Sequence, residues 1–427
     1  MIRPPARRQS VTAPGDPVEL VIEAIGAQGD GVSGRFFAPL TLPGERVRAR
    51  CDGERAEVLE ILEPSPDRVA PPCSHFGDCG GCALQHWASA PYLAWKVEQI
   101  RLALGRVRIE TEILDPYASP PGSRRRLALH ARREGRAIVL GFKARRSWRL
   151  AAIDACTIAD PRLIAALPAL RTIAGPFLEH PKSAPILHVT VTLTGLDIDV
   201  TGVERRSGGL SADARMRAAR VAADADVARV TLAGEVIYEA RPARVRFGAA
   251  TVDLAPGAFL QPVPQAEAAM TAFAVEAAAG AKRIADLYCG AGAFTFPLAA
   301  VAPVLAVDSA AGAVAALISA TASAPGLKSI TAQTRDLDRR PLLAQELKGV
   351  DVILFDPPRA GAAVQCGEIG RSKATRVIGV SCNPATFARD ARTLVDAGFT
   401  LDRLLPVDQF LWSPHIELVG VFSRGNR

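Results

Sequence analysis

The chain has 427 residues, which exceeds the size at which a single hydrophobic core stops growing, so we expect two or three domains. No apolar stretch reaches the roughly 20 residues that a bilayer span needs, and the basic N-terminus is followed by no secretory-type apolar region. These features exclude a membrane protein and predict a cytoplasmic location with reduced thiols, while the net charge of +7 permits a polyanionic partner.

Residues 18–65 combine β-type runs with glycine-containing turns, which predicts a small β-barrel after a short basic N-terminal tail. In the run ERVRARC, Val47 and Ala49 alternate with Arg48 and Arg50, so one face of this strand is basic. Such a face suits RNA binding, although a purely structural cap explains the barrel nearly as well.

A cysteine-rich stretch comes next. Three cysteines have the spacing C-x5-C-x2-C and a fourth lies far along the chain: Cys73, Cys79, Cys82 and Cys156. Four thiolates can complete a zinc tetrahedron or a cubane iron–sulfur cluster. Zinc sites more often pair two short C-x2-C knuckles, and here only one exists. The residues themselves predict a metal site but do not decide between zinc and an iron–sulfur cluster.

The segment from Pro121 to Leu150 is strongly basic and has the pattern of strands around a Glu134-Gly135 turn. Its only acidic residue is Glu134. Ten basic side chains accompany it: Arg124, Arg125, Arg126, Arg132, Arg133, Arg136, Lys143, Arg145, Arg146 and Arg149. We interpret the segment as a surface for RNA phosphates, and a solvated basic face is the alternative.

Alternating strand patterns continue over residues 185–255, and from Gln265 helices alternate with strands as in a doubly wound α/β domain. We therefore predict three domains. They are a barrel over residues 1–65, a central β-rich RNA-binding domain over 66–255, and an α/β domain over 256–427.

A buried strand opens into a glycine-bearing turn at RIADLYCGAG, where Gly290 and Gly292 allow a ligand close to the backbone. Asp308 ends the next strand, where a carboxylate can accept hydrogen bonds from ribose hydroxyls. The run lacks both a third glycine at dinucleotide spacing and a phosphate-binding G-K-S/T, which favours S-adenosylmethionine over NAD. An ordinary tight turn would explain the glycine pair alone equally well.

Two later strands end in polar motifs, VILFDPPRAG and VIGVSCNPATFARD. The carboxyl ends of strands face the ligand crevice of an open α/β sheet, so Asp356 and Cys382 should meet there. A helix N-terminus or a cation that lowers the thiol pKa would make Cys382 a nucleophile. The alternative is a buried structural cysteine, which suits Cys289 and Cys366.

These motifs resemble the S-adenosylmethionine-dependent RNA uridine-5-methyltransferases. The resemblance rests on DLYCGAGAFTFPLA, FDPPRAG, SCNPATFARD, DQFLWSPHIELV, GAFLQP and the upstream cysteines, and it covers nearly the whole chain from about Val18. It implies a class I, Rossmann-like methyltransferase domain. With an N-terminal barrel of the TRAM type and a cysteine cluster, the chain is most similar to the branch that acts on large-subunit ribosomal RNA. The tRNA branch usually lacks both features.

The resemblance also implies roles for individual residues. Cys382 is the nucleophile and Glu417 the general base, and the four cysteines hold a structural [4Fe-4S] cluster. Methyl-donor contacts fall to Gln261, Tyr288, Asp308, Asp336 and Asp356. Val263 and Ala293 stand where Asn is common in the family, and Asp308 where Glu is commoner, so we expect altered donor affinity with the chemistry retained.

Two functions of other classes compete with this hypothesis, a non-catalytic RNA-binding assembly factor and an iron–sulfur redox enzyme. Cys382 with Glu417 argues against the former, and the absence of a nicotinamide or flavin fingerprint against the latter. The expected partner is RNA, ribosomal rather than transfer RNA, and the expected state is a monomer.

Overall fold

The computed structural model describes residues 16–204 and 209–425 and divides into two compact units. Of the described residues, the smaller unit comprises 16–72, 82–92 and 412–414, and the larger comprises 73–81, 93–204, 209–411 and 415–425. The predicted basic N-terminal tail lies outside the described residues. Within the described ranges, no helix is long and apolar enough to cross a membrane.

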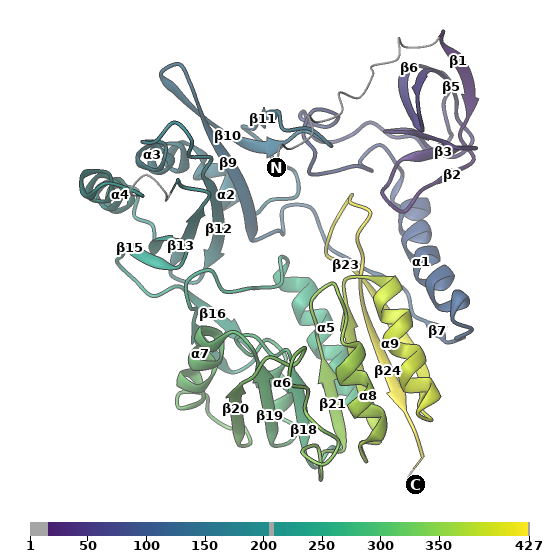
Figure 1. Cartoon of the computed structure of the whole chain (residues 1–427), viewed down its shortest axis with the longest axis vertical. Coiled ribbons are helices and arrows are strands. Elements are labelled where there is room, and N and C mark those ends of the chain that lie inside the picture. The colour runs from purple at the N-terminus through teal and green to yellow at the C-terminus, as the bar shows by residue number, and fades with distance from the viewer. Residues whose placement is uncertain (1–15, 205–208, 426–427) are drawn as a thin grey trace, which may run out of the picture. The chain divides into compact units, whose positions relative to one another are not determined.

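The smaller unit is built on a six-stranded sheet in the order β1-β5-β6-β4-β3-β2 (Figure 1). Its strands are β1 (Val18–Val21), β2 (Ala24–Ile25), β3 (Gly31–Ser33), β4 (Phe36–Ala38), β5 (Arg46–Asp52) and β6 (Arg55–Glu63). Val47 and Ala49 of β5 are buried in its core, whereas Arg48 between them is exposed and Arg50 is partly exposed, as the alternation predicts.

The arginines of β5 are balanced by glutamates of the neighbouring strands. Arg46 lies 2.5 Å from Glu63, Arg48 lies 2.8 Å from Glu60, and Arg50 lies 3.7 Å from Glu57. Because β5 and β6 are antiparallel, their cross-strand register brings these opposite charges together. The strand face that the sequence indicated as basic is therefore a row of ion pairs with little spare positive charge.

The first part of the larger unit is a seven-stranded sheet in the order β11-β10-β9-β12-β13-β14-β15. Its strands are β9 (Arg126–Glu134), β10 (Ala137–Lys143), β11 (Leu150–Ala152), β12 (Ile186–Thr192), β13 (Gly195–Thr201), β14 (Arg229–Leu232) and β15 (Glu235–Glu239). Helices α2 (Pro161–Ala165), α3 (Leu167–Phe177) and α4 (Ala212–Asp224) share one hydrophobic core with these strands. Strands β9 and β10 form the hairpin that the basic segment predicted.

The second part of the larger unit is a nine-stranded sheet ordered β20-β19-β18-β21-β22-β24-β23-β7, with β8 also paired to β23. The five strands from β20 to β22 are parallel, and β24 is antiparallel to β22 and β23. The bounds are β7 (Glu112–Ile113), β8 (Tyr117–Ala118), β18 (Ile284–Leu287), β19 (Val304–Asp308), β20 (Ile330–Thr334), β21 (Val352–Phe355), β22 (Arg376–Ser381), β23 (Thr400–Asp408) and β24 (Glu417–Ser423). Strands β7 and β8 thus join the α/β sheet, although they lie within the range predicted for the central domain.

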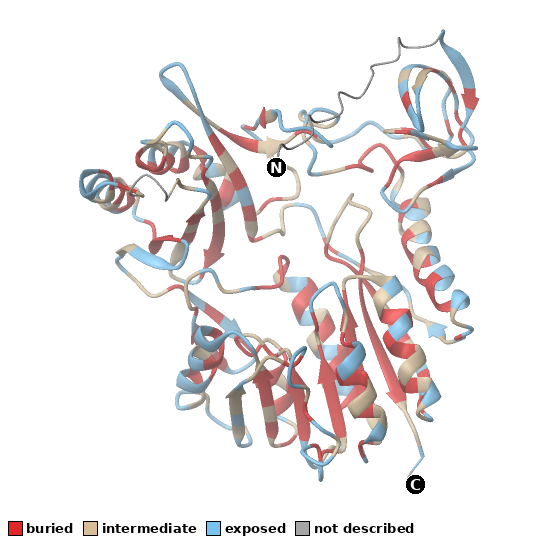
Figure 2. Ribbon diagram, viewed as in Figure 1, coloured by how far each residue is buried: buried red, intermediate tan, exposed pale blue. Residues whose placement is uncertain are grey.

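The central strands of this sheet are buried on both faces, as Figure 2 shows in red. Ala285 and Leu287 face one core while Ile284 faces another, because successive side chains of a strand point to opposite faces. The helices of this part of the chain are α1 (Ser89–Arg106), α5 (Pro264–Ala277), α6 (Thr295–Ala299), α7 (Ala311–Thr321), α8 (Ala363–Arg371) and α9 (Pro384–Asp396). Strands covered by helices on both faces characterise a doubly wound α/β fold.

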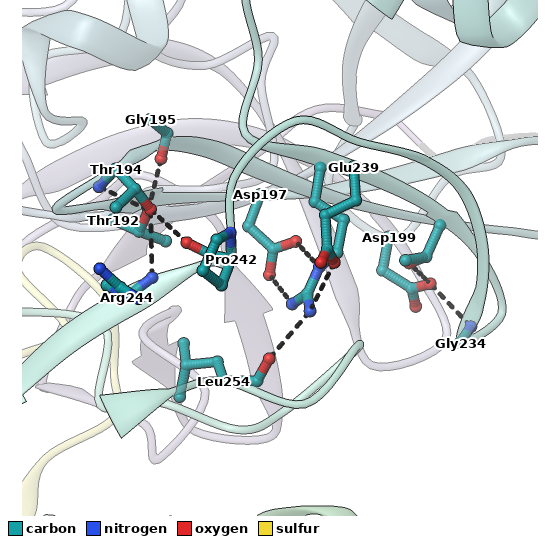
Figure 3. A network of polar contacts seen from close by, with 12 residues as sticks. Thr192, Thr194, Gly195, Asp197, Asp199, Gly234, Glu239, Pro242, Arg244 and Leu254 are labelled. Atoms are coloured by element: carbon teal, nitrogen blue, oxygen red, sulfur yellow. Dashed lines mark hydrogen bonds and ion pairs between the residues drawn. The ribbon is translucent and has the colours of Figure 1, made fainter. Parts of the chain in front are cut away.

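The hairpin of β16 (Arg244–Phe247) and β17 (Ala250–Asp253) leads from the seven-stranded sheet to the α/β sheet. At its end, the buried Arg229 guanidinium donates to both Asp197 oxygens, at 2.8 and 3.0 Å, and to the Leu254 carbonyl at 2.9 Å. Figure 3 shows Asp197, Glu239 and Leu254 converging around these contacts. The chain that leaves the hairpin is therefore fixed to the seven-stranded sheet.

Candidate active site

A cavity of about 990 Å³ opens where the parallel strands of the α/β sheet end. This is the size of a typical ligand pocket and the place where α/β sheets bind ligands. Eight of the predicted site residues line it: Gln261, Tyr288, Gly290, Asp308, Asp336, Asp356, Cys382 and Glu417. Arg124, which lies just before β9, and Arg126 and His188 of the seven-stranded sheet also contribute to its wall.

The turn after β18 has the backbone that a close-lying ligand requires. Tyr288 and Gly290 have positive φ angles of 62° and 53°, and a side chain added at Gly290 would point into open space. Gly292 does not line the cavity. A Cβ at Gly292 would come within 2.7 Å of the Phe296 ring, so this glycine allows the turn to pack on α6.

Asp308 is held by backbone groups alone. Its two oxygens accept hydrogen bonds from the amides of Gly290, at 2.8 Å, and Ala310, at 2.7 Å. Both bonds come from the loops that follow β18 and β19, so the carboxylate has a fixed orientation at the cavity wall. A carboxylate can still accept further hydrogen bonds after two, which suits it for ribose hydroxyls.

Asp336 and Tyr288 close the same side of the cavity. The Asp336 side chain accepts from the amides of Asp338 and Arg339, both at 3.1 Å, which fixes the loop after β20. The Tyr288 hydroxyl donates to Asp338 at 3.1 Å, and burial together with this carboxylate raises the pKa of the phenol. Tyr288 therefore stays protonated and acts as a hydrogen-bond donor.

Cys382 follows β22 and immediately precedes Asn383, the N-cap residue of α9. The predicted lowering of the thiol pKa is wrong for the free protein, because the pKa of Cys382 is raised to about 11. Burial is the largest cause, and the Glu417 and Asp356 carboxylates add to it, whereas the Arg359 guanidinium opposes them. The helix N-terminus and the cation are present, but desolvation and two neighbouring carboxylates outweigh them.

Asp356 and Glu417 are buried carboxyl groups linked by two glutamines. The Gln261 amide nitrogen donates to Asp356 at 3.2 Å, and the Gln409 amide nitrogen donates to Gln261 at 2.9 Å and to Glu417 at 2.6 Å. Burial, as the largest cause, raises the pKa of Asp356 to about 7 and that of Glu417 well above its ordinary value. Asp356 consequently exchanges its proton near neutral pH, and Glu417 holds its proton to a higher pH than an ordinary glutamate does.

Gln409 is the site residue that sequence reasoning missed. It lies directly after β23 and is buried, with 2% of its surface exposed, although it does not line the cavity itself. Its place within the quoted motif DQFLWSPHIELV, between a strand and Glu417, was the available signal. Only the fold shows that its amide reaches both Gln261 and Glu417.

Arginines of the seven-stranded sheet hold the segment that carries Gln261. Arg125 donates to the Gln261 carbonyl at 2.9 Å and pairs with buried Glu267 at 2.7 Å, and Arg126 donates to the Leu260 carbonyl at 3.0 Å. Arg125 is only 7% exposed. The interpretation of Arg125 as a phosphate contact is therefore wrong, since its guanidinium is already bound inside the protein.

The two departures from the family pattern lie outside the cavity wall. Val263 is the N-cap of α5 and supplies no side-chain hydrogen bond, where Asn would cap the helix. Ala293 packs against a core shared by the hairpin, α6 and α7. Neither residue lines the cavity, so the structure gives no basis for an effect on donor affinity through direct contact.

The loop of Cys73 and Cys79 lies against the strands that precede Cys156. His75 bonds to Asp154 at 2.7 Å, and Gly80 donates to the Lys143 carbonyl at 3.1 Å. Burial raises the pKa of both Cys79 and Cys156, and the Cys73 thiol contributes to each shift. Over residues 16–204 and 209–425, however, no group of His, Cys, Asp and Glu side chains has an arrangement that could hold a metal ion.

Comparison with known proteins identifies close relatives. The family model described as tRNA (uracil-5-)-methyltransferase matches residues 219–425. An uncharacterized RNA methyltransferase of Caulobacter vibrioides is 64% identical, covering 95% of this chain and 100% of the relative. The 23S rRNA (uracil(1939)-C(5))-methyltransferase RlmD of Chromohalobacter salexigens is 33% identical, covering 98% and 91% respectively.

Among solved structures, the Pyrococcus abyssi tRNA (uracil-54, C5)-methyltransferase in complex with S-adenosyl-L-homocysteine has a TM-score of 0.71. The alignment covers 95% of this chain and 99% of that one, at 23% sequence identity. At this identity the likeness establishes a shared fold, in agreement with the predicted class I, Rossmann-like methyltransferase domain.

Proposed function

This chain belongs to the S-adenosylmethionine-dependent RNA uracil-5-methyltransferases, and we propose that its target is a uridine of 23S ribosomal RNA, methylated through covalent catalysis by Cys382. The observation that carries the mechanism is the joint presence of Cys382, Glu417, Asp356 and Gln261 in one cavity at the strand ends. The near full-length similarity to a 23S rRNA enzyme supports the choice of RNA.

Gln261 and Asp356 offer a match for the edge of uracil. An amide N–H can donate to O4, and the adjacent carboxylate oxygen can accept from N3–H. In the free protein these two groups bond to each other at 3.2 Å, so they already stand side by side. We propose that they hold the target base after it has been flipped out of the RNA, because C6 cannot be reached within a stack.

Cys382 activates the base. Uracil C5 is a poor nucleophile, but addition of the thiolate to C6 forms an S–C6 bond and moves an electron pair toward C5 and O4 as an enolate. Arg359 favours the thiolate, and transfer of the thiol proton to Asp356 would remove part of the repulsion that raises the Cys382 pKa while leaving Glu417 as a carboxylate. Proton transfer within this group supports thiolate formation once the base is bound.

Glu417 completes the reaction. S-adenosylmethionine would supply an electrophilic methyl group: the enolate carbon C5 forms the new C–CH3 bond as the S–CH3 bond breaks, and S-adenosylhomocysteine is the leaving group. The Glu417 carboxylate then takes the proton from C5, and the electron pair of that C–H bond restores the C5–C6 double bond as the S–C6 bond breaks. Cys382 leaves as the thiolate and regains a proton, while Glu417 gives up the proton taken from C5, which returns both groups to the state of the free protein.

The donor side of the cavity fits an adenosine. Asp308 presents a fixed carboxylate, the Gly290 turn leaves space beside the backbone, and Tyr288 and Asp336 lie nearby. We propose that Asp308 binds the ribose hydroxyls and that Tyr288 and Asp336 line the remainder of the donor site. Gly292 acts indirectly in this proposal, by allowing the turn to pack.

We also propose that Cys73, Cys79, Cys82 and Cys156 bind a structural [4Fe-4S] cluster. The Cys73 thiol contributes to the raised pKa of both Cys79 and Cys156, which supports this proposal because it requires the three thiols to be near one another, although the described side chains do not form a metal-holding arrangement. Anaerobically purified protein should be brown and contain about four irons per chain. Protein that contains only zinc would contradict the cluster and leave the methyltransferase mechanism unaffected.

Mapping of 5-methyluridine across total RNA, from cells with and without the gene, tests the proposed function. One or more 5-methyluridines of 23S ribosomal RNA should disappear with the gene and return with a plasmid copy. Loss of 5-methyluridine from tRNA alone would show that tRNA, and not 23S ribosomal RNA, is the substrate. An unchanged map would contradict the methylation of either RNA.

A further inference from the structure

Phe259 is exposed within the wall of the active-site cavity. Its ring belongs to the lining residues and 70% of the residue surface is accessible. The two residues that follow it, Leu260 and Gln261, are only 3% and 5% exposed. Single exposed apolar residues are common on protein surfaces, so exposure alone indicates nothing. The position of this ring in the cavity that holds Cys382 and Glu417 is what requires an explanation.

The position of Phe259 is set by its surroundings. Arg126 donates to the carbonyl of Leu260 and Arg125 to that of Gln261, so the backbone directly after Phe259 is bound to the seven-stranded sheet. The Arg126 guanidinium carbon also lies 5.8 Å from the Phe259 ring centroid, within the range of a cation–π contact. The ring is thus oriented from one side by a cation and open to solvent over most of its surface.

The chemistry around the ring suits a nucleic-acid base. Arg124, Arg126 and His188 line the same wall and can contact phosphate or the base edge. An aromatic ring beside positive groups is the usual platform for single-stranded nucleic acid, because every base has a π-face that can stack. Gln261, which is proposed to contact the target uracil, is 5% exposed, whereas Phe259 is 70% exposed, so Phe259 lies nearer the cavity mouth.

We propose that Phe259, backed by Arg126, is a stacking platform for the RNA base that neighbours the flipped uridine. The inference rests on the proposed function and adds a second base-binding position to the same cavity. Flipping the target nucleotide removes one stacking partner from its neighbour, and the Phe259 ring replaces that partner. The platform therefore lowers the free-energy cost of base flipping without contacting the reacting atoms.

A pair of RNA probes measures this contact directly. The first probe is a single-stranded heptamer with a central uridine flanked by adenosines, and the second has abasic residues in place of both flanking adenosines. Fluorescence anisotropy gives the dissociation constant of each probe without a methyl donor present. The wild-type protein should bind the adenine-flanked probe more tightly by roughly 5- to 150-fold, the range of aromatic–base stacking.

Variants of Phe259 separate stacking from apolar contact. Phe259→Ala and Phe259→Leu should lose most of the preference for flanking adenines, whereas Phe259→Trp should retain it. Leu193→Ala is the matched control, because Leu193 is 62% exposed but lies outside the cavity wall. Unchanged affinity for S-adenosylhomocysteine in all four variants would show that the donor side of the cavity remains folded.

The outcomes distinguish this inference from the proposed function. Failure of the wild-type protein to bind either probe contradicts an RNA-binding cavity and therefore the proposed function as well. Binding of both probes with equal affinity contradicts the platform alone. A preference for flanking adenines that survives in Phe259→Ala also overturns it, since another group would then stack the neighbouring base.

Discussion

The two halves of the active-site cavity are built in different ways. On the donor side, Asp308 is fixed by two backbone amides from adjacent loops. On the uracil side, Asp356 and Glu417 are bound by the side chains of Gln261 and Gln409, which come from distant parts of the sequence. Backbone amides fix the orientation of the Asp308 carboxyl group, whereas burial raises the pKa of Asp356 to about 7. The first half is therefore suited to binding and the second to proton transfer.

Substitution of the proposed nucleophile, Cys382, should affect the uracil side of the cavity and leave the donor side unchanged. Cys382→Ala should reduce methyl transfer below detection, because no other group of the cavity can form the bond to C6. Binding of S-adenosylhomocysteine, measured by calorimetry, should be unchanged. Residual transfer comparable to the wild type would assign the nucleophile to another residue.

Arg125 supports the uracil half from the seven-stranded sheet, and its loss should be the largest effect on folding. Arg125→Ala leaves Glu267 buried without its charge partner, which should destabilise the protein by about 3–5 kcal/mol in urea unfolding. The double variant Arg125→Met with Glu267→Leu removes both charges and should recover most of that loss. A single variant of wild-type stability would show that the pair does not anchor the Gln261 segment.

Substitution of Asp308 probes the donor half. Asp308→Asn keeps the shape of the side chain but removes the charge, which is worth about 1.5–3 kcal/mol for hydrogen bonds to a charged group. The KM for S-adenosylmethionine should rise roughly 10- to 150-fold while RNA affinity stays constant. A change confined to RNA affinity would contradict the assignment of Asp308 to the donor.

Substitution of Gln409 should have the smallest effect of these variants, and it tests whether the uracil side of the cavity depends on the pKa of Glu417. Its amide lowers the pKa of Glu417, so Gln409→Leu should raise that pKa further. As the pH falls, the Glu417 carboxylate would then become protonated at a higher pH than in the wild type. Because only the carboxylate acts as a base, the acid limb of the pH–rate profile should move to higher pH. The rate at neutral pH should fall about tenfold. Gln265→Leu, on the exposed surface of α5, is the control and should leave the profile unchanged.

The same contrast explains what the sequence could predict. The donor turn, Asp308 and the strand ends follow from local patterns, because a parallel sheet brings its carboxyl ends to one edge. The link from Gln409 to Gln261 depends on how segments far apart in the sequence are packed. Arg125 belongs to a run of arginines, and only the fold separates buried members from exposed ones.

Some expectations stay predictions. The TRAM barrel, the domain boundaries at residues 65 and 255, the cluster and the monomeric state depend on closure, domain contacts or bound metal that sequence patterns do not specify. The sequence indicated that a helix N-terminus or a cation would lower the pKa of Cys382; both are present, but burial and the Glu417 and Asp356 carboxylates raise that pKa instead.

The central claim is that Cys382 forms the covalent bond and Glu417 breaks it after methyl transfer. The most direct test incubates Glu417→Gln protein with RNA and methyl-labelled S-adenosylmethionine, followed by a denaturing gel. Glutamine preserves the side-chain volume but cannot take the C5 proton, so labelled RNA should remain attached to the protein as a slow-migrating band that Cys382→Ala lacks. Normal turnover by Glu417→Gln without a labelled adduct would show that Glu417 is not the base.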